Sequence, residues 1–319
     1  MIRPLRPTDL VGVGMFLRRA DVTELTSHTW PKVQPECGRL PTAIALRQPL
    51  GLGPGWGRAW VATDDGALTG LLVARGRAGG LVWDVEHLHA VAGRPEVAAS
   101  LLDAVSQDAV SGGARRLFID MGAGEAGAHV ARRAGFERYT GVTIYRLDPP
   151  FSASRGDNFY EGRPRLRADE HALFSLYNAA VPAIVRSAEA MTYDEWSALH
   201  RGRRRWAPTL VGDRHQYVWE LGEGLAGWLE VVYGQRSQYL EVLIHPKFET
   251  MLDRFIGYAL KQTSEKAPVY STAREYQAGL GTALERFGFK EVACVDVFVR
   301  QLTVRVPECQ FVPAKIAGG

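Results

Sequence analysis

The chain repeats one short pattern half a sequence apart. Residues 134–139 read AGFERY and precede the strand-like segment 141–147, while FGFKEV at 287–292 precedes a similar segment at 294–300. Gly135 and Gly288 lie 153 residues (288 − 135) apart in a chain of 319. This spacing is too long for a solenoid, whose repeats span about 20 to 50 residues. The sequence therefore predicts two copies of one domain.

Composition narrows the class of protein. A hydrophobic content of 46% with 23% charged residues is typical of a globular chain. The net charge of +3 is too small to indicate a nucleic-acid partner. There is no apolar run of about 20 residues and no signal-peptide core, and the three cysteines are scattered. We expect a cytoplasmic monomer or homodimer that binds neither membranes nor nucleic acid.

Each copy is predicted to run through the same order of elements. In the first copy these are a hairpin (60–74), a long strand (81–91), a helix whose apolar face starts at Val97, a short strand (117–119), a helix (124–134) and a last strand (141–147). The second copy repeats them at 217–232, 239–244, 252–260, 269–271, 275–287 and 291–300. This order predicts an α+β fold, with a mixed, mostly antiparallel sheet flanked by helices in each copy.

A segment rich in Pro, Gly and Ser separates the two copies. It predicts an N-terminal domain at 1–150, a linker at 151–163, a C-terminal domain at 164–306 and a tail at 307–319. Near the start of the second copy, the apolar spacing over Leu173–Ala190 predicts a helical stretch packed on the core.

The order of elements and the Gly-Phe pairs at 135–136 and 288–289, each followed by a strand, resemble the GNAT superfamily of acetyl-CoA-dependent N-acetyltransferases. Two copies in one chain are similar to its tandem members. The resemblance covers nearly the whole sequence. It implies two acyl-CoA N-acyltransferase-like domains, acetyl-CoA as co-substrate, and a primary amine of a small molecule or peptide as acceptor.

The resemblance also implies where acetyl-CoA binds. The cofactor lies where the fourth strand parts from the fifth, and its pyrophosphate rests on a loop of pattern Gln/Arg-x-x-Gly-x-Gly/Ala at the start of a helix. In the first copy the implied residues are Leu88, His89 and Ala90 for strand amides, and Gly93, Arg94, Ala98 and Ala99 around the loop. Only Ala98 matches the loop pattern. The second copy, at 249–254, has no glycine and carries Glu249 and Asp253, so both loops are degenerate.

Acetyl transfer to an amine needs a base, which in the family is often a Glu on the fourth strand. Glu86 and Glu241 hold equivalent places on that strand; the alternative is a carboxylate on the open face of the sheet, paired with an arginine of the other domain. Period-two alternation puts Asp84, Glu86 and Leu88 on one face, with Val85, His87 and His89 on the other. The two histidines lack a third ligand, so we expect structural histidines and no metal.

The family's general-acid tyrosine is missing from both copies. Its positions hold Ala131 and Leu284, and Tyr276 could replace it only if the following helix were shifted; otherwise Tyr276 is a buried or capping residue. Two functions remain open. One is an acetyltransferase in which the first copy binds acetyl-CoA, and the other is a catalytically inactive tandem protein that serves as a binding or scaffold module.

Overall fold

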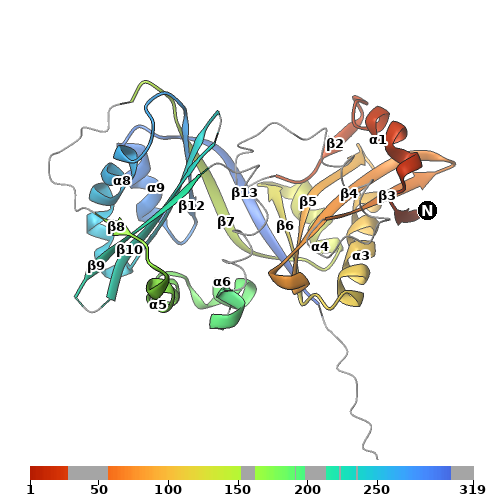
Figure 1. The fold of residues 1–319 in the computed structure, drawn as a ribbon. Coiled ribbons are helices and arrows are strands. Elements are labelled where there is room, and N and C mark those ends of the chain that lie inside the picture. The colour runs from red at the N-terminus through yellow and green to blue at the C-terminus, as the bar shows by residue number, and fades with distance from the viewer. Residues whose placement is uncertain are drawn as a thin grey trace, which may run out of the picture.

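A computed structural model describes residues 1–27, 57–151, 162–190, 192–197, 213–222, 224–234 and 236–302 (Figure 1). Most of the predicted linker and all of the predicted tail lie outside these residues. Within them, no helix is both long and apolar enough to cross a membrane.

From β3 onward, the described part of the first half has the predicted order of strands and helices, and β2 before it was not predicted. Its elements are β1 (Ile2–Pro4), η1 (Pro7–Asp9), α1 (Leu10–Phe16), β2 (Val22–Glu24), β3 (Arg58–Asp64), β4 (Ala67–Arg77), η3 (Ala78–Gly80), β5 (Val82–Val91), α3 (Pro95–Ser111), β6 (Arg116–Gly122), α4 (Glu125–Arg133) and β7 (Glu137–Leu147).

The described part of the second half repeats this order, except that α6 follows the first helix where the first half has β2. Its elements are β8 (Arg163–Pro164), η4 (Arg167–Asp169), α5 (Glu170–Ala180), α6 (Ala183–Glu189), β9 (Arg214–Leu221), β10 (Gly224–Tyr233), β11 (Gln238–Ile244), η5 (Pro246–Met251), α8 (Leu252–Lys261), β12 (Val269–Arg274), α9 (Ala278–Arg286) and β13 (Lys290–Gln301). The prediction of one helical stretch at 173–190 was wrong in one respect, because this segment forms two helices, α5 and α6. Val181 is extended (φ −101°, ψ 126°), since a residue before proline avoids the α conformation.

The two halves share one sheet because they exchange their last strands. The strand order is β1-β3-β4-β5-β6-β13-β7-β12-β11-β10-β9-β8, with β2 on the side of β5. β13 therefore pairs with β6 of the first half, and β7 pairs with β12 of the second half. Figure 1 shows β7 and β13 crossing the centre of the molecule side by side. The mixed sheet flanked by helices confirms the predicted fold class.

The exchanged strands complete the hydrophobic cores. Phe298 on β13 is fully buried among the apolar residues of α3, α4 and β6 in the first half. Tyr145 and Leu147 on β7 pack with α8 and α9 in the second half. Each half therefore buries apolar surface that belongs to the other half's last strand, which couples the folding of the two.

Each half begins with the same ion pair. Arg3 donates from both terminal nitrogens to the two oxygens of Asp9 (2.6 and 2.8 Å), and Arg163 does so to Asp169 (2.7 Å each). Asp169 also accepts the backbone N–H of Leu166 at 2.7 Å. The hydrogen bond from each arginine lowers the pKa of its aspartate below the usual value. These two ion pairs fix the conformation of the chain just before the first helix of each half.

Replacing Asp169 with Asn should lower the free energy of unfolding by about 1–2 kcal/mol at pH 7, because a half-buried bidentate pair is lost. A carboxylate whose folded pKa is lowered stabilises the fold above its unfolded pKa, near 3.8. That contribution disappears as the pH falls through the lower folded value. Urea unfolding at several pH values should therefore show the gap between wild type and Asp169→Asn closing below about pH 4. A gap that is constant with pH would contradict this assignment.

Candidate functional site

In the first half the two central parallel strands part, and the chain itself fills the opening. β5 pairs with β6 only from Val82–Val85 to Arg116–Ile119. We call the opening beyond these residues the first-half fork, and residues 22–27, which occupy it, the plug segment. On the β5 arm, Leu88 accepts the N–H of Leu25 at 2.8 Å. On the β6 arm, Ser27 donates its N–H to the carbonyl of Asp120 at 2.8 Å. The plug segment therefore bonds to both arms.

The plug segment covers the backbone edge predicted to hold the cofactor. The N–H of Leu88 donates to the hydroxyl of Thr26 at 3.2 Å, and His89 and Ala90 lie opposite Glu24 and Thr23 in the β2–β5 register. A pantetheine chain would have to displace β2 to reach this edge. A three-residue strand is too short for periodicity to reveal, so the sequence contained no clear sign of it.

The predicted phosphate loop of the first half offers few groups that could bind a phosphate. Gly93 makes a left-handed turn (φ +78°) before α3, and Arg94 forms an exposed ion pair with Asp64 at 3.0 Å. The first helical residue, Pro95, has no N–H to donate. Ala98 and Ala99 are buried. The start of this helix is therefore poorly equipped to cradle an anion.

A β-bulge at Glu86 breaks the predicted alternation along β5. The β4–β5 register runs from Val73 opposite His87 to Ala74 opposite Val85, which leaves Glu86 as an extra residue on β5. Val85 and Leu88 consequently both face the first-half core, and the predicted alternation was wrong because a bulge shifts the period by one residue. Glu86 forms an ion pair with Arg75 at 3.1 Å. It is paired with an arginine, as in the structural alternative, but the arginine comes from β4 of the same half and not from the other one.

The second half has an equivalent fork that no described strand fills. β11 pairs with β12 only from Gln238–Leu240 to Val269–Ser271, and beyond this point lies the second-half fork. The side chain of Gln277 crosses it, since its Nε2 donates to the carbonyl of Val242 at 3.4 Å. Glu241 is the first residue beyond the paired segment.

Glu241 faces the side of the sheet that α5 covers. Leu240, Val242 and Ile244 pack with α8 and α9 on one side, whereas Leu243 packs with α5 on the other. Because β11 and β10 pair without a bulge, strand alternation places Glu241 on the same face as Leu243. The carboxylate predicted as the second candidate base thus lies at the mouth of the second-half fork.

Aromatic side chains with polar atoms lie on the same side of the sheet as Glu241. Tyr177 of α5, Trp228 of β10 and Tyr276, which precedes α9, belong to one apolar cluster. The Tyr177 hydroxyl and the Trp228 indole N–H are buried and have no hydrogen-bond partner among the described residues. A buried polar atom without a partner costs free energy, so these two atoms mark places where a bound molecule could supply the missing bond.

The hydroxyls of both tyrosines stay protonated at neutral pH. Burial is the main cause that raises the pKa of Tyr276 to about 12, and the negative charges of Glu189 and Glu241 add to it. Burial likewise raises the pKa of Tyr177 well above its usual value. The charge of Glu241 thus acts on the Tyr276 hydroxyl. Tyr276 precedes α9, which starts at Ala278 rather than at the predicted residue 275.

A charged cluster from both halves forms one wall of this region. Arg274 at the end of β12 contacts Glu189 at the end of α6, with Nη1 and Oε1 2.5 Å apart. The hydroxyl of Tyr139, on β7 of the first half, donates to the same oxygen at 3.0 Å. The charge of Arg274 lowers, and that of Glu189 raises, the pKa values of Tyr177 and Tyr276. The site is therefore built where the halves meet.

The second phosphate loop repels anions less than its sequence indicates. Asp253 forms an ion pair with Arg286 at 2.5 Å, which balances one of its two acidic charges. The N–H groups of Lys247 and Phe248, however, donate to Nδ1 and the carbonyl oxygen of His245 at 3.2 and 2.8 Å. Few backbone donors are left at the start of this turn, so the phosphate cradle is weak in this half too.

No known family profile and no curated protein matches the chain, but solved structures do. It is similar to a tandem GNAT protein from the clavulanic acid biosynthesis pathway (17% identity, TM-score 0.51, covering 95% of this chain and 98% of that one). It is also similar to a GCN5-related N-acetyltransferase from Sphaerobacter thermophilus (14%, TM-score 0.52, 95% of each chain). A functionally unknown conserved protein from Staphylococcus epidermidis gives 9% identity and a TM-score of 0.53, over 76% of this chain and 94% of that one. The chain thus has a tandem GNAT fold, as predicted.

Proposed function

We propose that the protein is an N-acyltransferase that uses acetyl-CoA and a primary amine of a small molecule or peptide, and that catalysis takes place at the second-half fork. The observation that carries the proposal is the position of Glu241 at the mouth of a fork that no described strand fills. It lies on the side of the sheet where Tyr177 and Tyr276 pack, and its charge acts on Tyr276. The plug segment gives the first half a structural role instead.

The reaction needs few groups from the protein. The amine nitrogen attacks the thioester carbonyl, the new C–N bond forms, and the C–S bond breaks. Glu241 accepts the proton that the nitrogen loses, and this proton finally reaches the sulfur of the departing CoA. The Tyr276 hydroxyl, protonated because its pKa is about 12, can donate a hydrogen bond to that sulfur while it carries negative charge.

The remaining unsatisfied hydrogen-bond donors could bind the amine substrate. The Tyr177 hydroxyl and the Trp228 indole N–H lie on the α5 side of the sheet with Glu241. A polar atom of the acceptor that bonded to either would relieve the cost of its burial and orient the amine. This arrangement supports an acceptor with a hydrogen-bonding group near its amine rather than a purely aliphatic amine.

Acetyl-CoA should raise the melting temperature of the full chain. At 100 times its Kd, a ligand that binds only the native state adds about 2.7 kcal/mol of stability, which differential scanning calorimetry resolves. Hydrogen exchange should then slow in β11 and at the start of α8 but not in β5. The absence of any shift at millimolar acetyl-CoA would favour the alternative, a catalytically inactive tandem protein that serves as a binding or scaffold module.

A further inference from the structure

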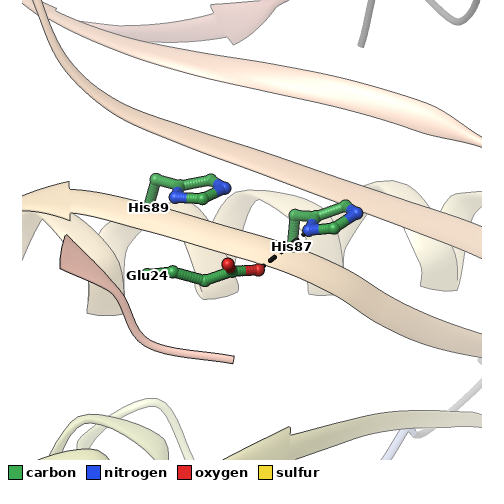
Figure 2. A group of neighbouring side chains, drawn as sticks. All are labelled: Glu24, His87 and His89. Carbon is green, nitrogen blue, oxygen red and sulfur yellow. Dashed lines mark hydrogen bonds and ion pairs between the residues drawn. The ribbon is translucent and has the colours of Figure 1, made fainter. Parts of the chain in front are cut away.

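Three side chains with metal-binding atoms converge in the first half, away from the proposed catalytic region. Glu24 comes from β2, and His87 and His89 come from β5 (Figure 2). One ligand atom from each lies within 4.8 Å of the others. His87 Nδ1 is 2.9 Å from Glu24 Oε1, and the two imidazole rings stack with their centroids 5.9 Å apart. The third ligand that the sequence did not reveal is Glu24.

Two features of the fold bring these residues together. The bulge at Glu86 turns His87 away from the first-half core, and His89, two residues later, lies on the same face. The register of the plug segment sets Glu24 directly opposite His89. Figure 2 shows the Glu24 carboxylate reaching from β2 toward His87, with the His89 ring alongside. The convergence therefore depends on β2 being in the first-half fork.

The donor set selects the kind of ion. Two imidazole nitrogens and one carboxylate oxygen suit Zn²⁺, whereas Mg²⁺ and Ca²⁺ prefer oxygen ligands alone. In a tetrahedral zinc site with bonds of about 2.0–2.1 Å, neighbouring ligand atoms are about 3.3 Å apart. The three ligand atoms, which lie within 4.8 Å of one another, would have to move closer to reach that spacing. His87 is buried, while the Glu24 side chain is 32% exposed, so an ion can reach the group from solvent.

A second layer of hydrogen bonds orients the carboxylate. The Thr26 hydroxyl donates to Glu24 Oε1 at 3.2 Å and accepts the N–H of Leu88 at 3.2 Å. Zinc ligands are commonly held in place by such outer contacts. We propose that Glu24, His87 and His89 form a Zn²⁺ site that ties the plug segment to β5. This proposal does not depend on the transferase activity.

Zinc titration of the full chain, after treatment with a chelator, tests the site. Wild type should bind one Zn²⁺, measured by competition with a chromophoric chelator, and should not bind Mg²⁺. Glu24→Gln and His89→Asn should each weaken zinc binding by more than about 100-fold, and Thr26→Val by about 10- to 100-fold. The matched control is His129→Ala, which removes an exposed histidine of α4 and should bind zinc like wild type.

Hydrogen exchange links the ion to the plug segment. Zinc should slow exchange of the peptide 22–27 severalfold in wild type and leave it unchanged in Glu24→Gln. Circular dichroism checks that each variant is folded. If Glu24→Gln does not fold, His89→Asn, at a half-buried position, serves as the ligand variant instead. No zinc binding by wild type, or equal binding by wild type and the folded ligand variants, would overturn the proposal.

Discussion

Replacing Glu241 with Gln should lower kcat by about 10²- to 10⁴-fold and leave the affinity for acetyl-CoA unchanged. The amide keeps the shape of the side chain but cannot accept the amine's proton, and general-base catalysis contributes a factor of this size. The loss should appear equally in kcat and kcat/KM for the acceptor, as expected when an interaction made only in the transition state is removed. Release of the CoA thiol, measured against a panel of primary amines, gives both constants.

Glu86→Gln is the matched control, since it makes the same change at the corresponding place of the first half. Glu86 lies on a bulge and pairs with Arg75, so we expect activity close to that of wild type. If Glu86→Gln slowed turnover more than Glu241→Gln did, catalysis would belong to the first half, and the plug segment would have to leave its fork during the reaction.

Replacing Phe298 with Ala should lower the free energy of unfolding by about 3–5 kcal/mol, the usual cost of removing a fully buried aromatic ring. Phe298 has no exposed surface, yet the core that buries it belongs to the first half. Because each half is completed by the other's last strand, we expect urea to unfold the whole chain in one cooperative transition, shifted to lower concentration in the variant.

Val292→Ala provides the control on the same strand. Val292 is 50% exposed, so its truncation should change stability by no more than about 0.5 kcal/mol. Two separate unfolding transitions, with Phe298→Ala affecting only the one that reports on the second half, would argue against the strand exchange.

The strand exchange also bears on the proposed function. Tyr139 reaches the second half on β7 and bonds to Glu189, whose charge acts on Tyr177 and Tyr276. The first half therefore contributes to the candidate catalytic region although its own fork is filled.

The local pattern of residues determined much of this protein. The Gly-Phe pairs at 135–136 and 288–289, with the periodicity before and after them, established the duplication, the order of elements and the tandem GNAT fold. The same pattern identified Glu241 as a candidate catalytic base. These features can be predicted from the sequence because the periods of strands and helices depend only on residues that are close together in the chain.

Contacts between distant residues decided the rest. Glu24 meets His87 across 63 positions, and nothing near either residue signals the other. The bulge at Glu86 depends on how β4 and β5 align, and the exchange of β7 and β13 depends on which strands pair when the two halves pack together. Pairing, register and burial are settled only when the whole chain packs, because each is a competition among surfaces that the linear sequence keeps apart.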